Sequence, residues 1–83
     1  PFYLRLSVIV RPGTLAKIAA ILGEAKIGIC SVMQPEGHVG ESVPLIMMLH
    51  DAPDAAMQKA LKRIARLSAV KAKPTMIRVE NFD

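Results

Sequence analysis

The segment Arg11–Thr14 combines residue types that can hold a small anionic or polar ligand. It stands between an alternating apolar run and a helical pattern, so we expect it at the start of a helix. Pro12 suits the first helical turn because its φ is fixed and it has no N–H, and Gly13 has no Cβ to block the outward-facing backbone N–H groups. The segment therefore predicts either a plain strand-to-helix turn or a turn that borders an effector pocket.

Residues that could act in catalysis or bind a metal are few and scattered. Cys30 lies in an apolar run, where a thiol usually behaves as a small hydrophobic side chain. His38 and His50 have no Cys or carboxylate at a spacing that makes a metal site. Three acidic residues are expected to be solvated or to cap a helix: Glu36, Glu41 and Asp51. Because P-loop, G-x-G-x-x-G and G-x-S-x-G motifs are also absent, we expect no catalytic or metal site in this chain alone.

The composition indicates one small domain with an aliphatic core. The 83 residues are 52% hydrophobic, with one Tyr, two Phe and no Trp. A domain of this size buries only about 60% of its unfolded surface, so we expect a partner to cover some of the rest. No apolar run reaches the ~20 residues of a membrane span, and one Cys allows no internal disulfide, so a cytoplasmic location is expected. The strand pattern begins at once after Pro1, as in a piece of a longer protein.

The net charge is +4, and the basic residues gather late in the chain. They are Lys59, Lys62, Arg63, Arg66, Lys71, Lys73 and Arg78. A basic cluster can contact nucleic acid, but helical spacing places most of these residues on the solvent side of a helix, near its C-terminus. Sheets that bind single strands stack bases on aromatic side chains, whereas the strand centres here are aliphatic. We therefore expect no nucleic-acid partner, and a nucleic-acid-binding module is the less favoured alternative.

Hydrophobic periodicity divides the chain into four strands and two helices. Strands are predicted over 2–9, 27–34, 43–50 and 75–80, with helices over 13–25 and from Asp51, which would cap it. In the second strand, Ile29 and Met33 alternate with Val32. The third strand is apolar almost throughout, which predicts a central strand with both faces covered and Pro44 at its entrance.

The order β-α-β-β-α-β predicts an α+β, ferredoxin-like sandwich over residues 1–83. Right-handed crossovers place both helices on one face of a four-stranded antiparallel sheet with strands ordered 4-1-3-2. The second strand is then an edge strand, and an apolar edge strand needs a cover. We therefore expect another copy of the chain to pair through the second strand or the helix-free face, giving a homodimer or a higher homo-oligomer.

The turn and its flanks resemble an ACT domain. The resemblance rests on the element order, on Arg11-Pro12-Gly13 followed by Thr14-Leu15-Ala16, and on Ile27-Gly28-Ile29. Over nearly the whole chain, Leu4-Arg5-Leu6, Ala20-Ile21-Leu22, Ser31-Val32-Met33-Gln34, Val43-Pro44-Leu45 with His50, and Ile77-Arg78-Val79-Glu80 look like the C-terminal ACT domain of bacterial homoserine dehydrogenases.

The resemblance implies a regulatory domain whose amino-acid effector, threonine in most such dehydrogenases, binds between the first turn of one copy and the second strand of its neighbour. The implied effector residues are Val10, Arg11, Pro12, Gly13, Thr14, Leu15, Gly28, Ile29, Ser31 and Gln34. The NAD(P)-binding and catalytic regions would lie outside this chain, which itself would hold no cofactor. Val10 stands where such domains often have Asp or Asn, and Gly28 where they often have a polar residue, so sensor and ligand-free pairing scaffold both stay open. An ACT domain of another enzyme of amino-acid metabolism is the runner-up.

Overall fold

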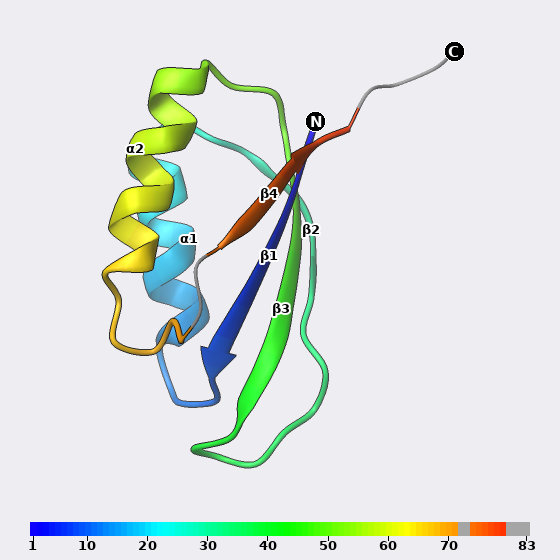
Figure 1. Ribbon diagram of the computed structural model, residues 1–83, viewed down its shortest axis with the longest axis vertical. Helices are drawn as coiled ribbons and strands as arrows, with labels where there is room; N and C mark the ends of the chain where they lie inside the picture. Colours follow the sequence, from blue (N-terminus) through cyan, green and yellow to red (C-terminus); the bar gives the residue numbers. More distant parts are fainter. Residues whose placement is uncertain (72–73, 80–83) are drawn as a thin grey trace.

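A computed structural model of the chain, which describes residues 1–71 and 74–79, shows the predicted ferredoxin-like order (Figure 1). The elements are β1 (Phe2–Ile9), α1 (Thr14–Glu24), β2 (Ile29–Met33), β3 (Ser42–Leu49), α2 (Asp54–Ala65) and β4 (Thr75–Arg78). Both helices cover the same face of the sheet, and the opposite face is open (Figure 1). The expected residue Glu80 of the last strand lies outside the described residues.

The sheet order is β2-β3-β1-β4, which confirms the predicted arrangement and places β2 at an edge. β1 pairs antiparallel with β3 over its whole length, from Phe2 opposite Leu49 to Ile9 opposite Ser42. This long central pair fixes which end of the sheet each loop occupies. The β1–α1 turn lies at the end of the sheet where β3 begins, and the α1–β2 connection lies at the other end (Figure 1).

The core is aliphatic and lies between the sheet and the two helices. β1 alternates buried side chains with half-buried or exposed ones, because successive residues of a strand point to opposite faces. The fully buried side chains come from both central strands and both helices: Leu4, Val8, Ile18, Leu22, Leu45, Met47, Leu49, Met57 and Ile64. The packing of these side chains between the sheet and the helices holds the start of α1 in a fixed position against the end of β1.

The predicted cap of the second helix is wrong. α2 begins only at Asp54, with the extended Pro53 as its N-cap residue and no side-chain capping hydrogen bond. Asp51 lies before that point and is exposed, and its Oδ1 is 2.6 Å from the Pro1 ammonium nitrogen. The carboxylate therefore pairs with a charge at the neighbouring strand end instead of capping the helix.

The predicted alternation of β2 is also wrong, because a β-bulge interrupts the strand. Ile29 pairs with Leu49 and Ser31 with Met48, which leaves Cys30 as the extra residue between them. Beyond the bulge, Val32 pairs with Met47 and so shares the helix-covered face with Ile29. Ser31 and Met33 consequently lie on the open face, where Met33 is 66% exposed.

The helices of this chain cover β3 on one face only, so the expectation of two covered faces is not met. Ile46 and Met48 are half-buried and face the open side of the sheet. Pro44 lies within the strand, opposite Ser7, rather than at its entrance. The missing N–H of Pro44 is tolerated because the ladder with β2 extends only as far as Ile46, so this part of β3 pairs with β1 alone.

Candidate functional site

The turn between β1 and α1 begins a helix with free backbone donors. Gly13 is the N-cap residue with φ of 86°, a left-handed conformation that glycine adopts without strain. Its carbonyl accepts the first helical hydrogen bond from the Lys17 N–H at 3.0 Å. Within the described part of the chain, the N–H groups of Leu15 and Ala16 have no acceptor. These two donors could hold a carboxylate.

Val10 contributes backbone structure and apolar surface to this site. Its N–H donates to the Glu41 carbonyl and its carbonyl accepts from the Gly40 N–H, both at 2.8 Å. Its half-buried side chain lies close to Gly37, where an added Cβ would be 3.3 Å from Val10 Cγ2. Both backbone polar groups of Val10 are therefore occupied, and its side chain offers a ligand only van der Waals contact.

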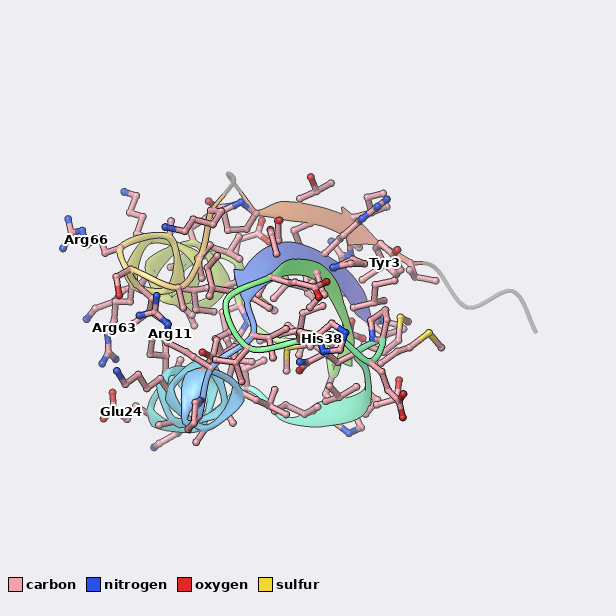
Figure 2. All side chains as sticks on the ribbon, turned by 90° about the horizontal axis from the view of Figure 1, so that it is seen from below. Tyr3, Arg11, Glu24, His38, Arg63 and Arg66 are labelled. Atoms are coloured by element: carbon pink, nitrogen blue, oxygen red, sulfur yellow. The ribbon has the colours of Figure 1, made fainter. Side chains whose placement is uncertain are left out.

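An open hollow of about 810 Å³ lies beside Val10, and Gln34 lines it as well. The rest of its lining comes from the loop between β2 and β3, including two carboxylates, Glu36 and Glu41. The Glu41 Oε1 accepts a hydrogen bond from the His38 N–H at 3.1 Å, and this loop crosses the end of the sheet (Figure 2). The hollow thus contains acidic groups that could accept an ammonium group.

Sequence reasoning missed Glu36 and Glu41 as site residues and expected them to be solvated. Periodicity does not determine the path of a loop, so no pattern in the sequence places them next to Val10. The two glycines of this loop, Gly37 and Gly40, allow it to fold back against the end of β1, but glycines in a loop do not reveal its path. An added Cβ at Gly37 would lie 2.9 Å from Val43 Cγ1, and Gly40 has φ of 93°.

Arg11, Pro12 and Thr14 line a different hollow, on the side of the turn that faces α2. The hydroxyl of Thr14 donates to the Ile9 carbonyl at 3.4 Å, which fixes the start of α1 on the end of β1. Leu15 is 38% exposed and does not line either hollow. The predicted turn residues are thus divided between two surfaces.

The predicted β2 residues lie at a distance from the turn within one chain. Ile29 is aligned with Leu49 and hence with Phe2, whereas the turn follows Ile9 at the other end of β1. Seven residue steps at about 3.3 Å each separate these levels by about 23 Å. One amino acid is too short to contact both Gly28 and Gly13 of the same copy.

Gly28 has a packing role that the sequence did not indicate. An added Cβ there would lie only 2.6 Å from Cδ2 of the His50 side chain. The His50 N–H also donates to the Gly28 carbonyl at 2.9 Å. The imidazole therefore occupies the space that any larger residue at position 28 would need, and it presents a polar group at the position where Gly28 offers none.

Three further observations concern the described residues. No group of three or more His, Cys, Asp or Glu side chains in residues 1–71 and 74–79 is arranged to hold a metal ion. The pKa of the Asp51 carboxyl is held below its ordinary value, first by the hydrogen bond from the Pro1 ammonium and then by its charge. No helix within these same ranges is long and apolar enough to cross a membrane.

Comparisons with known proteins relate the chain to one group of enzymes. It is 35% identical over 82 residues to a homoserine dehydrogenase of Methylobacillus glycogenes, covering 98% of this chain and 20% of that protein. The crystal structure of a homoserine dehydrogenase from Thiobacillus denitrificans superposes with a TM-score of 0.87 at 35% identity, over 96% of this chain and 17% of that one. A search of family models found no match.

A second structural likeness concerns the fold. The ACT domain of a GTP pyrophosphokinase from Chlorobium tepidum superposes with a TM-score of 0.72 at 8% identity, over 92% of this chain and 95% of that domain. This likeness shows that the fold is that of an ACT domain. The chain spans about a fifth of the length of the curated relatives it matches, which agrees with the expectation of a regulatory rather than a catalytic domain.

Proposed function

We propose that this chain, which has the ACT-domain fold and resembles one part of homoserine dehydrogenases, regulates such a dehydrogenase by binding an amino acid, with threonine as the first candidate. The parent enzyme would supply the NAD(P)-binding and catalytic regions. In this proposal the effector contacts the turn Val10–Leu15 of one copy and β2 of a second copy.

The observation that carries the proposal is the separation of the two halves of the site. The turn and Gly28 lie at opposite ends of the sheet, about 23 Å apart along β1. An antiparallel pairing of β2 with β2 of a second copy reverses one sheet relative to the other. Met33 is level with Arg5, so this reversal moves the Gly28 end of the second copy toward the first copy's turn. Pairing that extends beyond Met33 would bring the two halves of the site together.

The edge strand itself supports pairing between copies. β2 has β3 as its one neighbour in the described sheet, so one row of its backbone hydrogen-bonding groups is available. Val32 is 41% exposed and Met33 66% exposed, a large fraction for apolar side chains on a strand. A second β2 would satisfy the free backbone groups and cover both side chains.

In this proposal, different parts of the effector contact different parts of the site. The free N–H groups of Leu15 and Ala16 suit the carboxylate. The carboxylates of Glu36 and Glu41 suit the ammonium group, and they supply the acceptor that the Val10 side chain lacks. His50 of the paired copy provides a polar side chain where Gly28 has none. Val10 and Gly28, the two positions that depart from the ACT pattern, thus each have a compensating polar group in this proposal.

Pairing is tested by sedimentation velocity on the chain over a concentration series. Val32→Lys places a charge on the edge strand and should weaken self-association at least tenfold, since pairing would bring two like charges into the seam between the copies and desolvate them. Val39→Lys is the matched control, because Val39 is 80% exposed in the loop after β2 and should pair normally. A wild-type chain that stays monomeric at high concentration would contradict the pairing.

Ligand binding is tested by calorimetric titration with threonine, isoleucine, methionine and serine, on the chain and on the intact dehydrogenase. Saturable binding below several millimolar that Glu41→Gln weakens supports the sensor. Pairing without binding of any of the four favours the alternative, a domain that joins subunits and holds no effector.

A further inference from the structure

A compact basic cleft lies between the start of α1 and the segment that follows α2. Its volume is about 160 Å³, and the polar side chains that line it are Arg11, Thr14, Lys17, Arg66 and Ser68. Figure 2, which views the molecule along the sheet from this end, shows Arg11 between the two helices and Arg66 beside α2. Two elements far apart in the sequence thus direct three cationic side chains to one hollow.

The positive charge of this cleft is not balanced by the described residues. Arg63, in the last turn of α2, forms an ion pair with Glu24 at 2.5 Å, and Arg66 directly follows that helix. No carboxylate of residues 1–71 or 74–79 lies within ion-pair distance of the three cleft cations, and none lines the cleft. Three like charges close together repel one another, so an anion between them would be stabilised.

The backbone of the two helices adds little to this field. The cleft faces the N-terminal end of α1 and the C-terminal end of α2 at once, because the helices run antiparallel (Figure 1). The N-terminal end of a helix carries about half a positive charge and the C-terminal end about half a negative charge, so the two contributions largely cancel. The net charge of the cleft therefore comes from its side chains.

We propose that this cleft binds a phosphoryl dianion, either inorganic phosphate or the phosphate group of a small phosphomonoester. The cleft is small, about 160 Å³, and its three cations line one space that suits a compact anion. A nucleotide needs a pocket of several hundred Å³. An amino acid is disfavoured as well, because three cations repel its ammonium group.

The side chains suit this ligand in kind as well as in charge. The planar guanidinium groups of Arg11 and Arg66 can each donate two hydrogen bonds to phosphate oxygens, and Lys17 adds a compact charge. Arg11 Nη1 lies 3.5 Å from Ser68 Oγ, a long contact that holds the arginine over the cleft and leaves its remaining donors free. The site is separate from the hollow beside Val10, so it does not rest on the proposed effector function.

Titration with inorganic phosphate, followed by ¹⁵N NMR of the chain at pH 8 and constant ionic strength, tests the proposal. We expect saturable shifts of the Lys17, Ser68 and Ala69 amides with a millimolar Kd, and the same amides should respond to glycerol phosphate if a phosphomonoester is a ligand. Lys17→Gln and Arg66→Gln should each weaken binding three- to fivefold, as expected for loss of a partly exposed charge contact. Lys62→Gln, an equal charge change on the exposed side of α2, is the control and should change Kd less than twofold.

Several outcomes would overturn the proposal. Equal shifts with chloride would show that the cleft attracts any small anion without selecting phosphate, and tighter binding of succinate than of phosphate would assign the cleft to carboxylates. A Lys62→Gln effect as large as that of Arg66→Gln would mean that binding follows overall charge. Arg66→Lys keeps the charge and the fold but loses the planar donor pair, so it should bind at an intermediate affinity.

Discussion

The contact between Gly28 and His50 makes a sharp prediction about stability. In Gly28→Ala the new Cβ would lie 2.6 Å from His50 Cδ2, about 1 Å closer than ordinary van der Waals contact. The exposed imidazole must leave its rotamer or tilt away, which costs about 0.5–1.5 kcal/mol. The φ of Gly28 lies outside the left-handed region, so alanine itself fits the backbone and should stabilise by about 0.4–1 kcal/mol through the unfolded state.

In the Gly28→Ala variant these two effects oppose each other. A double-mutant cycle with His50→Ala separates them, because His50→Ala removes the clash. Gly28→Ala alone should change the free energy of unfolding by an amount between about 0.5 kcal/mol of stabilisation and about 1 kcal/mol of destabilisation. In the His50→Ala background the clash is gone, so the same substitution should stabilise by about 0.4–1 kcal/mol. The expected coupling of about 0.5–1.5 kcal/mol corresponds to several degrees in Tm for a domain of this size.

Urea unfolding of the four proteins, monitored by far-ultraviolet circular dichroism, measures the coupling. Gly23→Ala is the control, because no atom outside its own helix lies within 4 Å of the new Cβ and its effect should be the same with and without His50. A coupling between Gly28 and His50 below about 0.3 kcal/mol would refute the packing role of the imidazole.

Three other predictions test the turn, the core and the carboxylate beside Pro1. Gly13→Ala should destabilise the domain by about 1 kcal/mol or more, since φ of 86° strains any residue with a Cβ. In thermal unfolding, Gly13→Ala should lower Tm and the control Gly23→Ala should raise it. Leu45→Ala should cost about 2–5 kcal/mol in urea unfolding, because this fully buried side chain leaves a cavity in the centre of the sheet. The pKa of Asp51 is lowered, so its stabilisation is complete above the ordinary carboxyl pKa of about 4 and is lost as the pH falls through the lower folded value. Urea midpoints between about pH 6 and pH 2 should accordingly fall less steeply for Asp51→Asn than for the wild type.

The fold could be predicted because each element has a clear period and the connections allow few topologies. The alternation of β1 and the helical spacing of Ile18 and Leu22 correspond directly to the buried faces found in the structure. The bulge in β2 was not predictable, because Cys30 and Val32 are both compatible with either face of a strand. Its position is determined by how β2 fits the edge of β3, a tertiary constraint with no local sequence signal.

The candidate site could be predicted only at the turn. Gly13 has the left-handed backbone that its type and position suggest, and the donors of α1 lie beside it. Glu41 and His50 escaped prediction because their roles depend on which loop crosses which end of the sheet. The contact of His50 with Gly28 joins two strand ends that are distant in sequence and become neighbours only when β2 pairs with β3.

The distance between the turn and Gly28 has a thermodynamic consequence for any effector that contacts both. Such a ligand binds two copies at once, so its binding and the association of the chains are linked equilibria. The apparent affinity for the amino acid should then rise with the concentration of the protein, and the amino acid should tighten the association by the same factor. Where the copies are held together by a larger oligomeric enzyme, this dependence would disappear, and the domain would respond to the amino acid alone.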